Sequence, residues 1–191
     1  MLPEILSRQS CRTYLPTAVS QDAIQRILDA GCNAPSGANQ QPWHMIVVDS
    51  PERKRAIRNA CERADRTFHE HATATVREWL EDHSITTQKL FLTDAPVLIA
   101  VLYDPKAPYS LHSVWIAIAF MLLQAAREGL GSLPYTPSAA DVKDLLDVPK
   151  HLQFAAILPI GISQETVRQP RKPSSETQSW NQYGASREPA A

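Results

Sequence analysis

Apolar residues recur at helical spacing in some segments of the chain and form short continuous runs in others, which predicts helices and strands in alternation. Ser20 precedes apolar positions at Ile24 and Ile27, a spacing that predicts a helix over residues 20–33 with Ser20 as its N-cap. Three short apolar runs rich in β-branched residues predict buried strands at residues 43–49, 97–103 and 153–161. Strands separated by helices favour a mixed α/β or α+β sandwich.

The middle of the chain differs in pattern from the segment that follows it. Ser50 followed by Pro51 predicts the start of a helix, and residues 52–90 carry many charges with a sparse apolar stripe, which predicts exposed helices. Residues 111–128 are apolar nearly all round. They predict a central helix that is buried on most faces and that ends at Gly129.

The end of the chain loses this periodicity. Ser138 with Asp141 forms a variant capping box, which predicts a short helix over residues 139–146. Beyond Ser163 the chain is polar, contains prolines and shows no period, which is typical of a disordered tail. We therefore expect one domain over residues 1–163 and a separate terminal segment over residues 164–191.

Length and composition exclude several classes of protein. The 191 residues fit one domain with an appended arm, and six glycines without a G-x-G-x-x-G or P-loop motif exclude Gly-rich phosphate cradles. A net charge of −1 without a long single-sign block argues against nucleic-acid binding. The longest apolar run, residues 114–123, is about half of the ~20 residues of a membrane span. Without a secretory signal at the N-terminus, we expect a soluble cytoplasmic protein.

The three cysteines, Cys11, Cys32 and Cys61, form no C-x-x-C motif and indicate a reducing compartment. Cys11 lies between arginines, so a nucleophilic thiol is a weak alternative to an ordinary cysteine. Three histidines gather in the charged middle segment, but no accompanying ligand spacing supports a metal site there: His69, His71 and His83. We therefore expect no metal.

Arg8, Ser10 and Arg12 form the first of four polar clusters that could carry chemistry. Two guanidiniums that bracket a hydroxyl can bind a phosphate or the polar edge of an aromatic ring system, or else they are solvated surface groups. A second cluster is basic and lies in the polar tail, where a solvated surface is again the alternative: Arg168, Arg171 and Lys172.

The other two clusters lie in loops. One loop joins a predicted helix to a predicted strand, and its hydroxyl and amide groups suit a planar heterocycle or an ordinary connection: Pro35, Ser36, Asn39, Gln41 and Pro42. The other follows the apolar helix. There the backbone N–H groups of Tyr135 and Thr136 are expected to be free to donate, whereas the neighbouring prolines have none; the alternative is a helix cap and turn.

Taken in chain order, these clusters resemble the FMN-dependent nitroreductase family over about residues 4–184. The similarity is carried by R-x-S-x-R, by A-P-S-x-x-N-x-Q-P-W before a strand, by A-A-x-x-G-L-G-S after the apolar helix, and by a terminal R-K-P. The resemblance implies an α+β fold, a three-layer α-β-α sandwich with a central, mostly antiparallel sheet and extended terminal arms. It also implies a homodimer with FMN at the interface and residues 164–191 wrapped around the partner subunit.

The resemblance assigns roles to individual residues. Arg8 and Ser10 would face the FMN phosphate and ribityl chain, Arg12 the pyrimidine edge of the flavin, and Arg171 the phosphate. The backbone N–H of Thr136 would lie near flavin N5, while Pro137 stands where many relatives have glycine, which puts the flavin O4 contact in doubt. Pro35, Ser36 and Asn39 would reach the ring from the partner subunit. The implied cofactor-binding set is Arg8, Gln9, Ser10, Arg12, Pro35, Ser36, Asn39, Gln41, Tyr135, Thr136 and Arg171.

The implied activity is that of an FMN-dependent oxidoreductase. NADH or NADPH would reduce FMN and leave, and an electron-poor aromatic such as a nitro compound or quinone would then take its place in a ping-pong cycle. The flavin carries this chemistry, so no side chain besides Arg12 is assigned to it. The middle segment shows no recognisable substrate lid of the dehalogenating relatives, which argues against that reaction. Alternatives are a flavin-dependent dehydrogenase of the same fold, a non-catalytic flavin-binding protein, and a domain without a cofactor.

Overall fold

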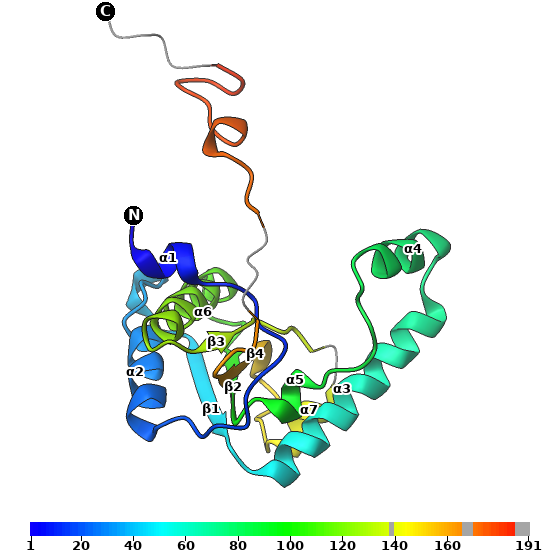
Figure 1. Cartoon of the computed structure of the whole chain (residues 1–191). Coiled ribbons are helices and arrows are strands. Elements are labelled where there is room, and N and C mark those ends of the chain that lie inside the picture. Colours follow the sequence, from blue (N-terminus) through cyan, green and yellow to red (C-terminus); the bar gives the residue numbers. More distant parts are fainter. Residues whose placement is uncertain (138–139, 166–169, 186–191) are drawn as a thin grey trace, which may run out of the picture.

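A four-stranded antiparallel sheet forms the centre of the computed structural model, which describes residues 1–137, 140–165 and 170–185 (Figure 1). Its strand order is β1-β2-β4-β3, so β1 and β3 form opposite edges. Each neighbouring pair is antiparallel, with Trp43 opposite Tyr103 at one end of the β1 and β2 pair. The strands are β1 (Trp43–Val48), β2 (Val97–Tyr103), β3 (Gly131–Ser132) and β4 (Gln153–Gly161).

Helices cover both faces of the sheet, as a three-layer α-β-α sandwich requires (Figure 1). One layer contains α1 (Pro3–Ser7), α2 (Gln21–Cys32) and α6 (Ser110–Arg127). The other contains α3 (Pro51–His71), α5 (Phe91–Asp94) and α7 (Ala140–Leu145). The helix α4 (Ala74–Asp82) stands away from the sheet at the end of α3, and short 3-10 turns occur at Gly37–Asn39 and Ser174–Glu176. The predicted fold class is confirmed.

Two apolar cores lie on the two faces of the sheet. Ile99 and Val101 of β2 pack with Ile118 of α6 on one face, while Leu98 of β2 packs with Ile57 of α3 on the other. All seven residues of β2 are buried because side chains alternate between two covered faces. This explains why the strand is a continuous apolar run in the sequence.

Local signals in the sequence define the helix starts. The Ser20 hydroxyl accepts a hydrogen bond from the backbone N–H of Ala23 at 3.2 Å, and the Ser50 hydroxyl accepts one from the N–H of Arg53 at 3.3 Å. Both predicted N-caps are therefore confirmed. The predicted cap Ser138 lies outside the described residues, although α7 follows it. The strands predicted at 43–49, 97–103 and 153–161 match β1, β2 and β4.

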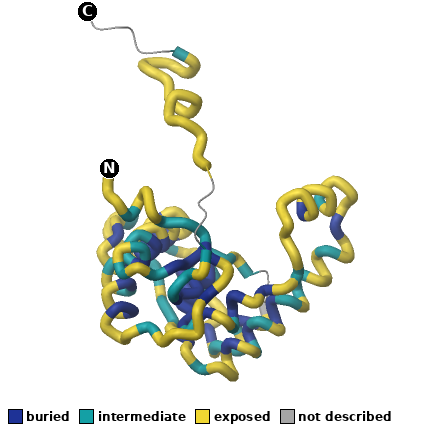
Figure 2. Tube along the Cα trace, in the orientation of Figure 1, coloured by how far each residue is buried: buried dark blue, intermediate teal, exposed yellow. Residues whose placement is uncertain are grey.

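The prediction that the apolar helix is buried on most faces is wrong. The sheet and α2 cover one side of α6, whereas Leu111, Trp115, Ile116 and Phe120 stay exposed on another (Figure 2). Within the described part of the chain, α6 is the one helix long and apolar enough to cross a membrane, but its inner face forms the core. Its composition alone could not show which side is left uncovered.

The strand β3 was not predicted either, because two residues are too short to show any period. Gly131 is needed at this place, since a Cβ atom there would meet Cys11 Sγ at 2.7 Å and Ser163 Cβ at 2.8 Å. Close contact of three chain segments thus excludes a larger residue from this edge of the sheet.

We expect Gly131→Ala to lower the free energy of unfolding by about 1–3 kcal/mol, because the added methyl group overpacks this edge. Urea unfolding followed by circular dichroism measures the change. Gly129→Asn is the matched control: φ is +72° at Gly129, a conformation that Asn tolerates, and a Cβ there meets nothing within 4 Å. An unchanged stability of Gly131→Ala would contradict the packing described here.

Candidate functional site

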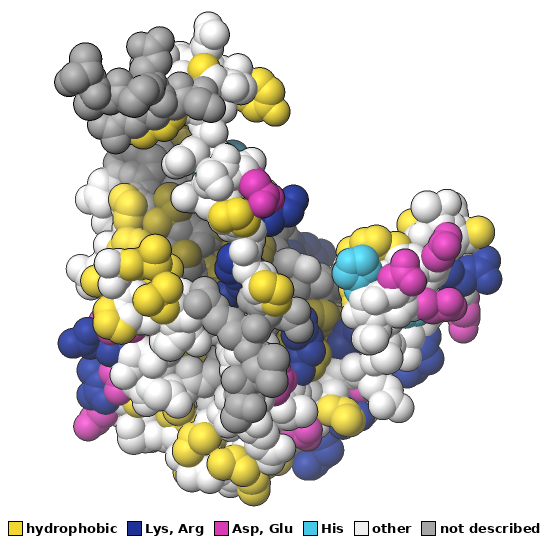
Figure 3. Space-filling model, turned by 45° about the horizontal axis from the view of Figure 1, so that its top comes forward, with side chains coloured by type: hydrophobic (Ala, Val, Ile, Leu, Met, Phe, Trp, Pro, Cys, Tyr) yellow, Lys and Arg dark blue, Asp and Glu magenta, His cyan; other side chains and the backbone are white. Residues whose placement is uncertain are grey.

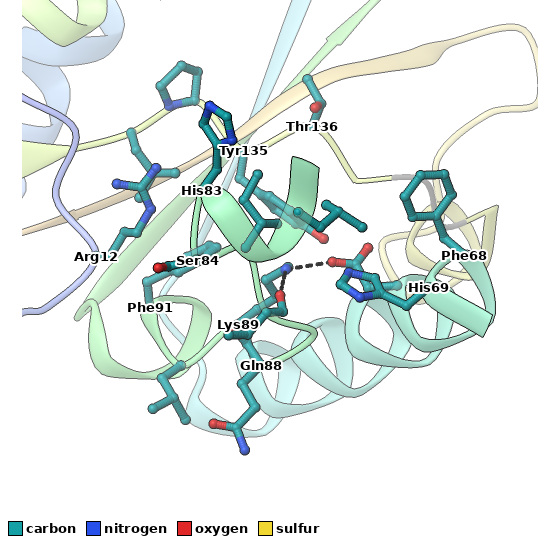
Figure 4. A pocket seen from close by; sticks show the side chains of 17 residues that line it. Arg12, Phe68, His69, His83, Ser84, Gln88, Lys89, Phe91, Tyr135 and Thr136 are labelled. Carbon is teal, nitrogen blue, oxygen red and sulfur yellow. Dashed lines mark hydrogen bonds and ion pairs between the residues drawn. The ribbon is translucent and has the colours of Figure 1, made fainter. Parts of the chain in front are cut away.

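A cavity of about 710 Å³ lies between α3, the segment after α4 and the loop that follows β3 (Figure 4). Its apolar lining includes Phe68, Leu80 and Phe91, and its wall also carries charged and hydrogen-bonding groups. The charged and hydrogen-bonding residues of the wall include Arg12, Asp65, His69, His83, Lys89 and Thr136. The cavity can therefore hold a ligand that is largely planar and apolar but has a polar edge.

Arg12 reaches the cavity from an extended N-terminal segment that lies beside β3. Ser10 forms a parallel bridge with Ser132, and the backbone N–H of Cys11 donates to the Ser132 carbonyl at 3.1 Å. Arg12 itself is exposed, and within the described residues no carboxylate lies in ion-pair distance of its guanidinium. Its positive charge is thus available to a ligand. Arg8, Gln9 and Ser10 are half-buried along the same segment.

The loop after β3 contradicts one expectation. The backbone N–H of Tyr135 donates to the Ile157 carbonyl at 3.0 Å, and Ile157 N–H donates back at 2.7 Å. The prediction of a free Tyr135 N–H is therefore wrong, because Tyr135 extends the backbone pairing along β4. In the described chain the N–H of the next residue, Thr136, makes no such bond, and Thr136 is exposed at the cavity.

A buried ion pair closes one side of the cavity and was missed by sequence reasoning. Lys89 Nζ lies 2.6 Å from Asp65 Oδ2, with side-chain exposures of 8% and 19%. The same ammonium donates to the Thr86 carbonyl, and Figure 4 marks both contacts by dashed lines. It also lies 5.9 Å from the ring centroid of Tyr135. The pair joins positions 24 residues apart, so no local pattern could have indicated it.

The Tyr135 side chain lies beneath this pair. Its hydroxyl is buried and has no hydrogen-bond partner among the described residues, and its ring packs edge-on against Phe91 at 5.4 Å. Burial raises the pKa of the Tyr135 phenol and raises that of the nearby Cys61 thiol to about 12. Both groups are therefore neutral at physiological pH.

The loop with Pro35, Ser36, Asn39 and Gln41 does not line this cavity. It is ordered by its own contacts, because Ser36 Oγ accepts from Gln41 N–H at 3.0 Å and Gln41 Nε2 donates to Asn39 Oδ1 at 3.2 Å. The loop leads into β1, whereas Arg12 lies beside β3. With about 4.8 Å between strands, these two edges are about 14 Å apart across the sheet. One chain therefore does not bring both groups together.

The remaining candidates lie apart from the cavity or inside the protein. Arg171 is exposed in the segment 170–185, and Arg168 lies outside the described residues. Cys11 is only 2% exposed, so the alternative of a reactive thiol is wrong. His69 and His83 line the cavity and His71 does not, and the described residues contain no group of three potential metal ligands.

The middle segment forms the largely exposed helices α3 and α4, as predicted, and part of it also lines the cavity. Most residues that line the cavity lie between Asp65 and Phe91, at the end of α3 and around α4. The sequence shows no recognisable substrate lid here, but because this segment lines the cavity, that observation no longer argues against dehalogenation.

A family model described as Nitroreductase family matches residues 5–162. The chain is a member of the nitroreductase family. An iodotyrosine deiodinase of Thermotoga neapolitana is 40% identical over 144 residues, which cover 75% of this chain and 76% of the relative. An NADH dehydrogenase of Thermus thermophilus is 26% identical over 84% of this chain and 85% of its own. The crystal structure of an oxidized iodotyrosine deiodinase bound to FMN and 3-iodo-L-tyrosine superposes with a TM-score of 0.84, at 35% identity, over 90% of this chain and 94% of that one.

In this nitroreductase-family chain, we expect Lys89→Met to lower the free energy of unfolding by about 2–3 kcal/mol, because it leaves the Asp65 carboxylate without its partner. The double variant Asp65→Asn, Lys89→Met should recover part of that loss. Urea unfolding of both proteins tests this. The exposed pair Arg63 and Asp141 provides the control: Arg63→Ala should cost less than about 1 kcal/mol. Equal losses in Lys89→Met and Arg63→Ala would contradict a structural role of the buried pair.

Proposed function

We propose that this chain is a soluble, cytoplasmic FMN-dependent oxidoreductase. NADH or NADPH and an electron-poor aromatic, such as a nitro compound or a quinone, would occupy its cavity in turn. One observation carries the proposal: the Arg12 guanidinium stands without a carboxylate partner, among the described residues, on the wall of a cavity lined by aromatic and aliphatic side chains. A planar cation beside an apolar slot suits a flavin ring, which is apolar on its faces and polar along one edge.

The donors at the cavity fit FMN chemically. The Arg12 guanidinium and the backbone N–H of Thr136 can only donate hydrogen bonds, whereas N1 and O2 of a flavin, and N5 of the oxidised ring, accept them. Arg8 and Ser10 would hold the phosphate and ribityl chain, and Arg171 would add a second cation for the phosphate. Pro137 has no N–H, so the O4 contact needs a donor elsewhere. The FMN bound by the deiodinase structure supports this assignment.

When bound, FMN supplies the hydride acceptor and donor of the reaction. The protein supplies charge and position: Arg12 would stabilise negative charge along the pyrimidine edge in both halves of the cycle. Phe68, Leu80 and Phe91 give the cavity an apolar wall, beside which the charge of Arg12 would act more strongly than in bulk water because the local dielectric is lower. The NADH dehydrogenase relative supports a nicotinamide as the electron donor.

A homodimer would complete the site. The exposed face of α6 presents Leu111, Trp115, Ile116 and Phe120, each between 37% and 45% exposed. Figure 3 shows hydrophobic side chains gathered around the N-terminal helix α1, which packs against α6. The loop with Ser36 borders the same face, because Gly37 N–H donates to Ser113 Oγ of α6. A second copy docked on this face would bring its own Pro35, Ser36 and Asn39 toward the cavity of the first chain.

Reductive dehalogenation of a halogenated phenol is the second candidate. It is favoured by the identity of 40% to the Thermotoga neapolitana deiodinase and by the cavity wall that residues between Asp65 and Phe91 form. In this reaction two electrons and one proton replace a carbon–iodine bond by a carbon–hydrogen bond and release iodide. The same donors at Arg12 and Thr136 would serve both candidates.

The visible spectrum of the purified protein tests for a bound flavin, and steady-state assays separate the candidates. NAD(P)H oxidation with menadione or a nitrofuran is expected for the first. Release of iodide from 3-iodotyrosine in the presence of dithionite, with little NAD(P)H oxidation, would favour the second. A yellow protein that is inactive in both assays would point to a flavin-binding protein without turnover.

We expect Arg12→Ala to weaken FMN binding about tenfold to a hundredfold, because a charge-assisted hydrogen bond contributes about 1.5–3 kcal/mol. Reduction of the remaining flavin by NAD(P)H should also slow, with the fold intact. Fluorescence titration and stopped-flow absorbance measure these effects. Arg77→Ala, an exposed position on α4 that does not line the cavity, is the control. Unchanged affinity and reduction rate in Arg12→Ala would exclude the proposed role.

We expect Phe120→Glu to convert the dimer to a monomer, because a buried carboxylate without a partner opposes docking of the apolar face. The same protein should lose most of its FMN. Sedimentation and the flavin-to-protein absorbance ratio measure the two effects together. Val47→Glu, which alters an exposed apolar residue on the edge strand β1, is the control. A monomer of Phe120→Glu that keeps its flavin would contradict a shared site.

A further inference from the structure

The segment that carries Arg12 is held by a residue from the opposite end of the chain. Glu165 Oε1 accepts hydrogen bonds from the backbone N–H of Arg12 and, at 3.1 Å, from that of Thr13. It also accepts from Thr13 Oγ1 at 3.3 Å. Two further hydrogen bonds flank this carboxylate. The Gln9 side chain donates through Nε2 to the Glu165 backbone carbonyl at 2.7 Å, and the backbone N–H of Gln164 donates to the Thr13 carbonyl at 3.1 Å.

The Glu165 carboxylate binds the backbone of Arg12 and not its side chain. The structure records no ion pair between the two residues, although both lie close enough to Tyr14 for their charges to act on its hydroxyl. The contact therefore leaves the guanidinium to face the cavity. Surface arginines such as Arg26 differ, because there the carboxylate of Glu128 forms an ion pair with the guanidinium itself.

Two converging backbone N–H groups fix the direction of the chain. An ionised carboxylate forms stronger hydrogen bonds with N–H groups than a neutral carbonyl does. Bonds to two successive N–H groups restrict the backbone dihedral angles between Arg12 and Thr13, and these angles set the direction of the Arg12 Cα–Cβ bond. Without this acceptor the side chain would sample directions away from the cavity.

We infer that Glu165 is a positioning residue for the cofactor: it orients the Arg12 segment so that the guanidinium is presented to FMN. This inference rests on the proposed function, because it assumes that Arg12 contacts the flavin. Glu165 lies five positions before Pro170, where the exposed C-terminal segment begins. The affinity for FMN would thus depend on a residue at the start of the C-terminal segment 164–191, far from Arg12 in sequence.

A double-mutant cycle on FMN affinity tests the inference. Apoprotein is titrated with FMN, and the dissociation constants are compared for the native protein, Glu165→Ala, Arg12→Ala and the double variant. We expect Glu165→Ala to weaken binding about tenfold in the native background and to have no further effect when Arg12 is already alanine. Glu165→Gln keeps an oxygen that accepts both N–H bonds and should retain most of the affinity. Glu176→Ala is the control, since this exposed carboxylate has no recorded contact with the Arg12 segment.

The outcomes separate two kinds of failure. If Arg12→Ala binds FMN as the native protein does, the proposed role of Arg12 fails and the inference fails with it. If Arg12→Ala weakens binding but Glu165→Ala has no effect or an additive one, only the positioning role is overturned. Circular dichroism establishes that each variant is folded. Should Glu165→Ala not fold, Glu165→Asp replaces it in the same cycle, because its shorter side chain cannot reach both N–H groups.

Discussion

Backbone pairing along β4 is the constraint on which the candidate site depends. The strand β4 lies inside the sheet, and β3 and Tyr135 both pair with its backbone on one side. The residues that follow β4 pair with the Arg12 segment. Two ends of the chain and the loop before α7 are thereby brought to one edge of the sheet. The cavity lies beside this edge, between the end of α3, the segment after α4 and the loop that follows β3.

The elements that could be predicted from sequence are those with local causes. Ser20 and Ser50 cap helices that follow them directly, and β2 is a continuous apolar run because both of its faces are covered. Other features arise from contacts between distant residues. The Tyr135 N–H is occupied by Ile157, and Lys89 is paired with Asp65; no local pattern encodes either partner. Likewise, an apolar helix does not reveal which of its sides the rest of the protein covers.

The candidate site of this nitroreductase-family chain has two parts. Hydrogen-bond donors lie on segments that the sheet fixes, and a wall is formed by helices outside the sheet. Arg12 and Thr136 lie on segments fixed by the sheet, which suit a cofactor that every reaction of such a protein would share. The wall between Asp65 and Phe91 belongs to helices outside the sheet. Substrate choice between a nitro compound, a quinone and a halogenated phenol would depend on this wall, since fold alone does not determine function.

In the proposed dimer, each site would take Arg12 from one chain and the loop with Ser36 from the other. Mixing two variants tests it most directly: Arg12→Ala weakens the site through its own chain, and Ser36→Trp blocks the site of the partner by its bulk. At an FMN concentration that fills native sites and leaves both variant sites empty, subunit exchange allows mixed dimers to form. An equal mixture should bind flavin in about a quarter of all sites, because half of the dimers are mixed and each mixed dimer has one native site. No recovery after proven exchange would contradict a site shared between two chains.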